Sequence, residues 1–235
     1  MAANGDPRDA DPIGSGPALM ALRDRQSLRE EVAQALRAAI IAGQIRPGTL
    51  YSAPTLAARF GVSPTPVREA ILDLAKEGLI TIVKNKGFRI RSLSERELDE
   101  ITQIRELLEI PVVADQVGRL SAEQLKELGV LADAIVVAAG RGDVVAYVEA
   151  DNAFHLTLLR TGGNQRLVDT VADLRSRTRL YGLDSLRETG QLVASADEHV
   201  ELVTLLSAGD RDAVVDAMRR HLRHIRGIWA AQPER

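Results

Sequence analysis

The fold of the N-terminal third is decided by residues 54–78, PTLAARFGVSPTPVREAILDLAKEG. This stretch contains two short segments with the apolar spacing of helices, and Gly61 separates them. Ser63 followed by Pro64 is typical of a helix N-cap with proline at the first helical position, and Gly78 ends the second segment. Two short helices joined by a turn that contains glycine predict a helix-turn-helix.

The segments on either side extend this pair to a winged helix-turn-helix. Upstream, the capping-box pattern of Ser27-Leu28-Arg29-Glu30 predicts a longer helix that ends at Gly43. Downstream, the turn Lys84-Asn85-Lys86-Gly87 joins two alternating segments, whose buried face is expected to consist of Ile80, Ile82, Phe88 and Ile90. The winged domain is expected over residues 27–92, after a disordered tail, residues 1–26.

The rest of the chain, residues 93–230, has the pattern of an all-α domain. A second capping box at Ser94 to Glu97 and three glycine-containing breaks divide it into helices. Six are expected, at about residues 94–118, 121–139, 143–160, 164–180, 188–208 and 210–230. Pro111 should kink or break the first of them. The protein is therefore expected to be mainly α, a winged helix-turn-helix followed by an antiparallel helical bundle.

Composition excludes several classes of protein. With 235 residues, 45% hydrophobic and 27% charged, the chain is long enough for two domains and unlike a disordered or fibrous protein. It has no cysteine, which removes disulfides, thiol catalysis and cysteine-ligated metals. No apolar run approaches the roughly 18 residues that span a bilayer, and the polar start has no signal-peptide pattern. A cytoplasmic protein with no membrane partner is expected.

The charge of the chain is unevenly distributed. The net charge of −3 divides into −1 for residues 1–26, +5 for residues 27–91 and −7 for residues 92–235. A basic winged domain joined to an acidic helical domain predicts that the winged domain binds a polyanion.

The N-terminal third resembles the GntR type of bacterial transcription regulator. The resemblance is carried by Ile45-Arg46-Pro47-Gly48, Leu56-Ala57, the stretch from Phe60 to Ile71, Glu77-Gly78-Leu79-Ile80 and Asn85-Lys86-Gly87. It implies double-stranded DNA as partner, with the third helix in the major groove and the wing tip near the minor groove. The residues expected to contact DNA are Ser63, Thr65, Arg68, Lys84, Lys86, Gly87 and Arg89.

Two features qualify this DNA-binding hypothesis. Arg68 could pair with guanine, but a surface charge on a helix is the alternative, and the wing lysines could equally lie on a solvated turn. The chain also has Pro64 where the family often has arginine, and Ala53-Pro54 where it often has a charged or polar pair. The operator sequence therefore stays open.

Polar residues interrupt the apolar rows of three helices in the second half. They are Asp151 and His155, spaced i,i+4, then His199 and His221. Three imidazoles and a carboxylate match the ligands of a divalent metal, zinc first, with nickel or manganese as alternatives. The order of these residues resembles the FCD-type ligand domain that follows GntR-type DNA-binding domains, while the alternative is a set of satisfied core histidines. His224 is interpreted as a residue of the surface, or as one that lies beside the ligands without binding the metal itself.

Arg105 interrupts the apolar row of the first helix of this domain. FCD-type domains resemble this arrangement, with an arginine facing the effector pocket, and a guanidinium matches a carboxylate bidentately. A small carboxylate effector, bound by Arg105 and the metal, is therefore expected. The alternative is an ion pair with Glu109 or Asp151.

Together these patterns predict a metabolite-responsive transcription regulator with no catalytic residues. It would dimerise through its helical domain and bind a pseudo-palindromic operator. One alternative is a metal-dependent hydrolase or isomerase acting on small acids, because an open metal position can activate water. The other is an architectural DNA-binding protein whose helical domain is purely structural.

Overall fold

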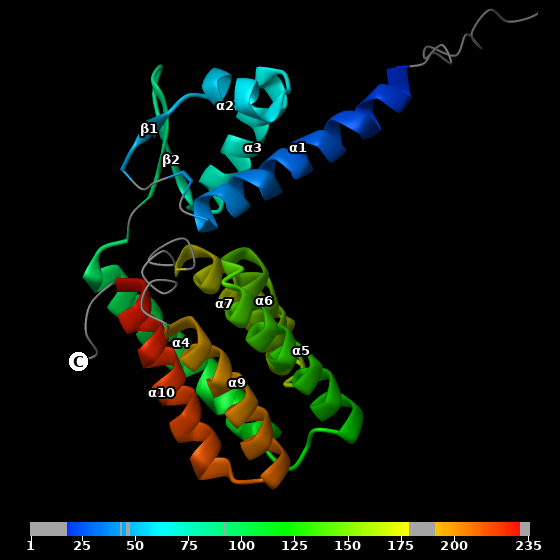
Figure 1. The fold of residues 1–235 in the computed structure, drawn as a ribbon, viewed down its shortest axis with the longest axis vertical. Helices are drawn as coiled ribbons and strands as arrows, with labels where there is room; N and C mark the ends of the chain where they lie inside the picture. Colours follow the sequence, from blue (N-terminus) through cyan, green and yellow to red (C-terminus); the bar gives the residue numbers. More distant parts are fainter. Residues whose placement is uncertain (1–17, 43, 46–47, 92, 179–190, 231–235) are drawn as a thin grey trace, which may run out of the picture.

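A computed structural model describes residues 18–42, 44–45, 48–91, 93–178 and 191–230 of the chain. The N-terminal part contains α1 (Ala18–Ile41), β1 (Leu50–Tyr51), α2 (Ala53–Phe60), α3 (Pro64–Lys76), β2 (Ile80–Val83) and β3 (Gly87–Ile90). The C-terminal part contains α4 (Glu95–Gln116), α5 (Ala122–Arg141), α6 (Val144–Arg160), α7 (Gln165–Thr178), α9 (Gln191–Ala208) and α10 (Arg211–Ala230). The predicted architecture is confirmed: a winged helix-turn-helix stands on a helical bundle (Figure 1).

The helix-turn-helix is held by local hydrogen bonds and by a shared core. Ser52 caps α2 by accepting a hydrogen bond from the Thr55 N–H, and Gly61 ends the helix in the left-handed conformation. Ser63 is the N-cap of α3 but makes no capping bond. The residue that would donate to it is Pro66, which has no N–H. The usual capping bond from the third residue of the helix is therefore missing at Ser63.

The wing is a three-stranded antiparallel sheet in the order β1-β3-β2. Strand β1 has only two residues, too few for an alternating pattern, and the sequence analysis missed it. Gly87 lies against β1 with φ of 134°, and a Cβ at this position would stand 2.0 Å from the Tyr51 carbonyl oxygen. Ile82, expected on the buried face, is 49% exposed because it lies on the edge strand near the outer end of the hairpin, whereas Phe88, opposite it on the central strand, is buried.

One expectation about a helix boundary was wrong, and another was wrong in part. Helix α1 begins at Ala18 and not at the capping box of Ser27, because residues 18–22 are Ala, Leu and Met, all strong helix formers. Residues 18–26, assigned to the tail, are therefore helical, whereas the predicted disorder of residues 1–17 lies outside the described residues. Helix α4 is not broken at Pro111 and continues to Gln116, because Ile110, Val113 and Ala114 hold it against the core on both sides of the proline; the kink expected as the alternative to a break stays a prediction.

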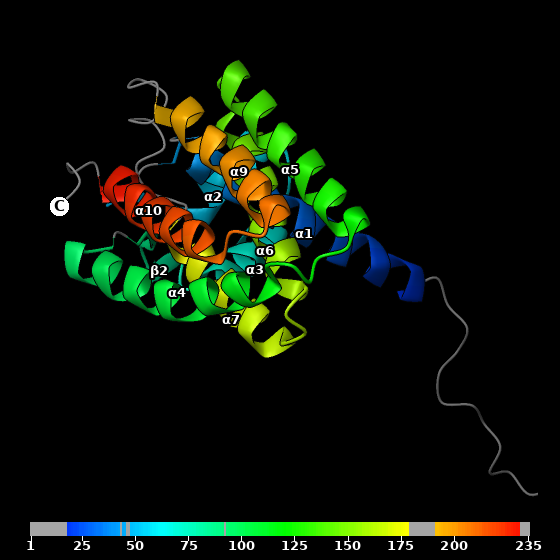
Figure 2. The same cartoon turned by 90° about the horizontal axis from the view of Figure 1, so that it is seen from below.

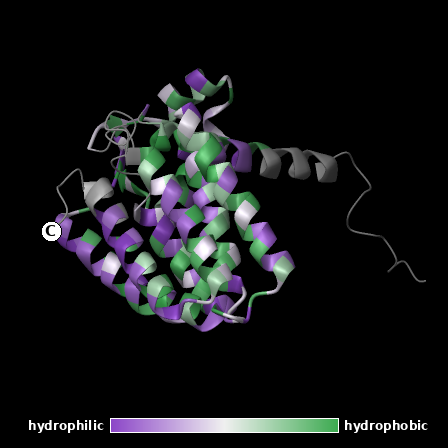
Figure 3. Cartoon of the chain, turned by 60° about the horizontal axis from the view of Figure 1, so that its bottom comes forward, coloured by the Kyte–Doolittle hydropathy of each residue, from purple (hydrophilic) through white to green (hydrophobic). Residues whose placement is uncertain are grey.

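The helical domain encloses a single apolar core. Helix α10 packs on α4 and α9, α5 packs on α6 and α9, and α7 covers α6 and α4 (Figure 2). The buried apolar residues of all six helices form one cluster, and in Figure 3 hydrophobic residues (green) and hydrophilic residues (purple) alternate along these helices. In the described part of the chain no strand follows β3, and none of the described helices is long and apolar enough to cross a membrane.

Candidate metal centre and nucleic-acid interface

Three helices bring the four predicted metal ligands to one point in the core of the helical domain. Asp151 and His155 come from α6, His199 from α9 and His221 from α10, and all four are buried. The Nε2 atom of His155 lies 3.1 Å from the Nε2 atoms of both His199 and His221, and Nε2 of His199 lies 3.1 Å from Oδ1 of Asp151. Metal–ligand bonds of about 2.0–2.1 Å give tetrahedral ligand spacings of about 3.3 Å, so the arrangement suits a divalent cation.

The outer nitrogen of each imidazole faces an acceptor. Nδ1 of His199 lies 3.0 Å from the Ser195 carbonyl oxygen, and Nδ1 of His221 lies 2.7 Å from Oε2 of Glu198. Nδ1 of His155 lies 3.8 Å from Oε2 of Glu109. With the proton on Nδ1, the lone pair on each Nε2 is directed at the common centre. This is the tautomer that a histidine ligand needs.

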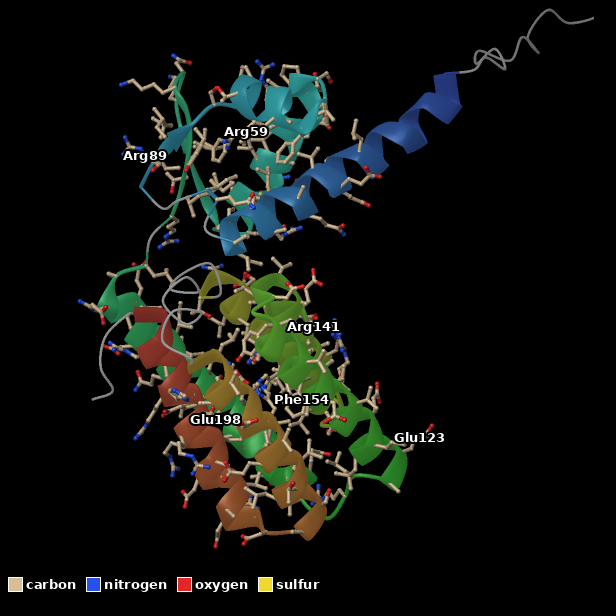
Figure 4. The ribbon with its side chains drawn as sticks, viewed as in Figure 1. Arg59, Arg89, Glu123, Arg141, Phe154 and Glu198 are labelled. Carbon is tan, nitrogen blue, oxygen red and sulfur yellow. The ribbon has the colours of Figure 1, made fainter. Side chains whose placement is uncertain are left out.

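Burial favours the neutral form of two of the imidazoles, His155 and His221. It lowers the pKa of His155 well below its usual value and that of His221 to about 4. The pKa of Glu198 is raised by its own burial, but hydrogen bonds from His221 and His224 outweigh this and lower it to about 2. Glu198 is thus an ionised carboxylate that lies between His221, a candidate ligand, and His224. Nδ1 of His224 lies 2.7 Å from Oε1 of Glu198. Figure 4 shows Glu198 on α9.

A buried four-charge cluster adjoins the histidines. Arg175 donates from Nη2 to Oδ2 of Asp151 at 2.7 Å, and its Nη1 lies 3.5 Å from Oε2 of Glu109. Arg105 donates from Nε to Oε1 of Glu109 at 2.6 Å, so the ion pair weighed as an alternative for Arg105 is present. Arg175 was missed by the sequence analysis, although it interrupts the buried row Val168, Val171, Thr178 as Arg105 does in its own helix.

Several polar atoms of this four-charge cluster lack a hydrogen-bond partner in the part of the chain that the structure describes. The cluster consists of Arg105, Glu109, Asp151 and Arg175. Within the described residues, Nη2 of Arg105, Nε and Nη1 of Arg175 and Oε2 of Glu109 are buried and have no hydrogen-bond partner. A buried polar atom without a partner costs about 1–3 kcal/mol. Three such donors on two arginines, beside a candidate metal centre, indicate a place where a ligand with acceptor atoms would be stabilised.

The predicted DNA contacts come from the start of α3 and from the β2–β3 hairpin, whose turn points away from the helical domain (Figure 1). Six of the seven are exposed: Ser63, Thr65, Arg68, Lys84, Lys86 and Arg89. Figure 4 shows Arg89 on the wing and Arg59 on α2, an exposed cation that the sequence analysis did not single out. Gly87 is partly buried and is already required by its contact with Tyr51, whether or not DNA approaches it.

Comparisons with known proteins agree with both halves of the structure. The family model described as "Bacterial regulatory proteins, gntR family" matches residues 28–90 of this chain. The family model described as "FCD domain" matches residues 100–224. The HTH-type transcriptional repressor RspR of Escherichia coli (strain K12) is 28% identical over 207 residues, which cover 87% of this chain and 90% of that protein. The HTH-type transcriptional regulator McbR of the same strain is 30% identical over 190 residues, or 79% and 85% of the two chains.

A solved structure shows the same architecture. The structure of E. coli McbR/YncC superposes with a TM-score of 0.71 at 26% sequence identity, covering 87% of this chain and 97% of that one. A winged helix-turn-helix on a helical ligand domain defines a DNA-binding regulator. The chain belongs to the GntR family of bacterial regulatory proteins and carries an FCD domain as its helical half. It is a transcription regulator and not an enzyme, so the hydrolase or isomerase alternative is wrong.

Proposed function

We propose that this regulator holds a divalent metal ion on Asp151, His155, His199 and His221. The observation that supports this most strongly is the convergence of four ligand atoms, all within 4.8 Å of one another, inside an apolar core. Zinc suits three imidazoles and a carboxylate, and nickel or manganese are the alternatives. When bound, the ion supplies a Lewis-acidic position for an anionic oxygen.

A small carboxylate is the proposed effector. The orphan donors of Arg105 and Arg175 lie in the charge cluster that includes the candidate ligand Asp151, so a carboxylate bound there would meet a guanidinium and the ion together. Arg105 keeps its predicted role, with Arg175 as a second anchor. Because the effector would bind one state of the protein better than another, it would shift operator affinity.

The proposed regulator binds a pseudo-palindromic operator as a homodimer, which predicts a dimer in sedimentation. Each protomer contributes one winged helix, with the recognition residues at the start of α3. Ile104 and Leu107 on α4 are large apolar side chains exposed at 43% and 69%, and support dimerisation through the helical domain. A cytoplasmic location is proposed as well, because a bacterial regulator must reach the chromosome.

The test is metal analysis of purified protein, with zinc titration by calorimetry. One ion per chain is expected, and His199→Ala should lose it. Asp197→Asn is the matched control, because Asp197 lies on the exposed side of the same helix. Unchanged metal content in His199→Ala would support the interpretation as satisfied core histidines instead.

A further inference from the structure

The winged domain and the helical domain meet where α3 ends and α7 ends. The guanidinium carbon of Arg177 lies 3.7 Å from the place that a Cβ on Gly78 would occupy, and Nη1 lies 3.8 Å from it. Gly78 has φ of 76° and follows the C-cap of α3. A cavity of about 170 Å³ at this joint is lined by Gly78 and Arg91 from one domain and by Leu93, Ile101 and Arg177 among others from the next.

The last turn of α7 carries two arginines with different surroundings. Arg175 is 1% exposed and is paired with Asp151, a candidate metal ligand. Among the described residues, Arg177 forms an ion pair with Asp173 of its own helix at 2.9 Å, and its buried Nε has no hydrogen-bond partner there. Residues two positions apart in a helix point in nearly opposite directions. One turn of helix therefore contacts the candidate metal centre on one side and the end of the recognition helix on the other.

A cation at the candidate centre would act on this turn through Asp151. Oδ2 of Asp151 holds Arg175, while Oδ1 faces Nε2 of His199. A divalent ion on Oδ1 would share the carboxylate with Arg175 and repel its guanidinium, since like charges in a buried site interact strongly. The ion pair that holds the last turn of α7 would weaken, and the turn would move together with Arg177. Where the packed surface between two domains has two stable arrangements, a small shift of this kind can rotate one domain relative to the other.

We propose that Arg177 is the positioning residue that transmits the state of the metal centre to the recognition helix, through its contact with Gly78. The inference rests on the proposed metal function and assigns its regulation to one contact. Gly78 lies in a left-handed turn, and the guanidinium of Arg177 stands at van der Waals distance from the position that a Cβ there would take, so the two elements are direct neighbours at this joint. The contact also joins α3 at its C-terminal end, so that the DNA-facing end remains available to DNA.

The experiment is hydrogen exchange of the full chain, with and without zinc. In the unsubstituted protein, zinc should slow exchange around residues 151–155 and 199–221. It should also change exchange in residues 74–80 by about threefold or more. In Arg177→Ala the first effect should persist and the second should vanish. Arg166→Ala is the matched control, because Arg166 is an exposed arginine in the first turn of the same helix.

The possible outcomes separate the inference from the proposed function. A zinc response of residues 74–80 that survives in Arg177→Ala overturns the inference, as does its absence from the unsubstituted protein when residues 151–155 respond. Zinc that alters neither region would contradict the proposed metal site, and the inference with it. If Arg177→Ala does not fold, Arg177→Gln replaces it, because it keeps much of the side-chain length without the charge.

Discussion

Glu198 links the candidate metal centre to the edge of the helical domain. Its two oxygens each lie 2.7 Å from an imidazole Nδ1, on His221 and on His224. The carboxylate therefore sets the tautomer of His221 and orients its Nε2 toward the other ligands. A single residue outside the ligand set thus decides whether one of the four ligands is ready for a metal ion.

Glu198→Gln should weaken zinc binding by about 10–100-fold, as the loss of an outer-shell partner typically does. The amide lacks the charge that favours a protonated Nδ1 on His221. Competition with a chromophoric chelator measures the affinity. Glu201→Gln on the same helix is the control, since Glu201 pairs with Arg220 on the surface. Equal losses in both variants would show that Glu198 has no special role.

Acid should destabilise the metal-free protein through the same residues. The pKa of His221 is about 4 in the folded state against 6.5 as reference, so the unfolded chain takes up protons first as the pH falls. This contribution to stability is complete above pH 6.5 and lost toward pH 4, a difference of about 3 kcal/mol. Glu198, with a pKa of about 2, adds a further loss below its reference value of 4.5. Urea unfolding at pH 7 and pH 4.5 should show the loss of folding stability. In His221→Gln the free energy of unfolding should depend less on pH.

The two kinds of DNA contact should differ in their effects. Arg68→Ala should relax specificity at one position in each half-site, at a cost of about 1–3 kcal/mol. Lys86→Ala should weaken binding to all sequences alike and reduce the salt dependence by about one phosphate contact. Binding titrations over a set of mutated operators at several salt concentrations separate the two. Unchanged specificity in Arg68→Ala would contradict the placement of the recognition helix.

At the level of elements, the wing depends on one glycine. Strand β3 pairs with β2 on one side and with the two-residue β1 on the other, and Gly87 stands at the point where β1 comes closest. Short strands provide little hydrogen bonding by themselves. The geometry of the wing, and with it the placement of Lys84 and Lys86, therefore rests on this close approach.

Gly87→Ala should displace β1 and destabilise the winged domain by about 1–3 kcal/mol or more, because its Cβ would overlap the Tyr51 carbonyl. Thermal unfolding monitored by circular dichroism measures this loss. Gly48→Ala is the control: Gly48 also has a positive φ, but its surroundings are open, so only backbone strain is added. A Gly87→Ala variant as stable as Gly48→Ala would show that β1 can be displaced at little cost in free energy.

At the scale of the whole molecule, the two domains have separate cores and should respond separately to loss of metal. One core lies between α1, α2, α3 and the sheet, and the other lies within the bundle, with Ile41 packed against both. A metal ion on α6, α9 and α10 would connect helices of the second core alone. A bound metal ion would therefore stabilise the helical domain directly, and it would act on the winged domain only through the proposed contact at Arg177.

Chelation should lower the melting temperature of the helical domain by about 5–10 °C and leave the winged domain folded. The expectation follows from mass action, about 2.7 kcal/mol at a hundredfold excess of metal over the dissociation constant. Differential scanning calorimetry with and without EDTA resolves the transitions. A melting profile that is unaffected by EDTA in protein shown to contain metal would contradict the proposed ligands.

The sequence by itself determined the helix-turn-helix, the hairpin, the all-α second half and the four candidate metal ligands. Each of these features is encoded by residues close together in the sequence: helix caps, glycine breaks, alternating apolar and polar residues, or a polar residue in an apolar row. Tertiary structure alone decided that Arg175 pairs with Asp151, that β1 completes the wing and that Arg177 meets Gly78. These contacts join residues far apart in the chain, so they depend on how helices pack and not on any local pattern. The start of α1 at Ala18 escaped prediction for another reason: helix propensity extended the helix past a sequence that looked like its cap.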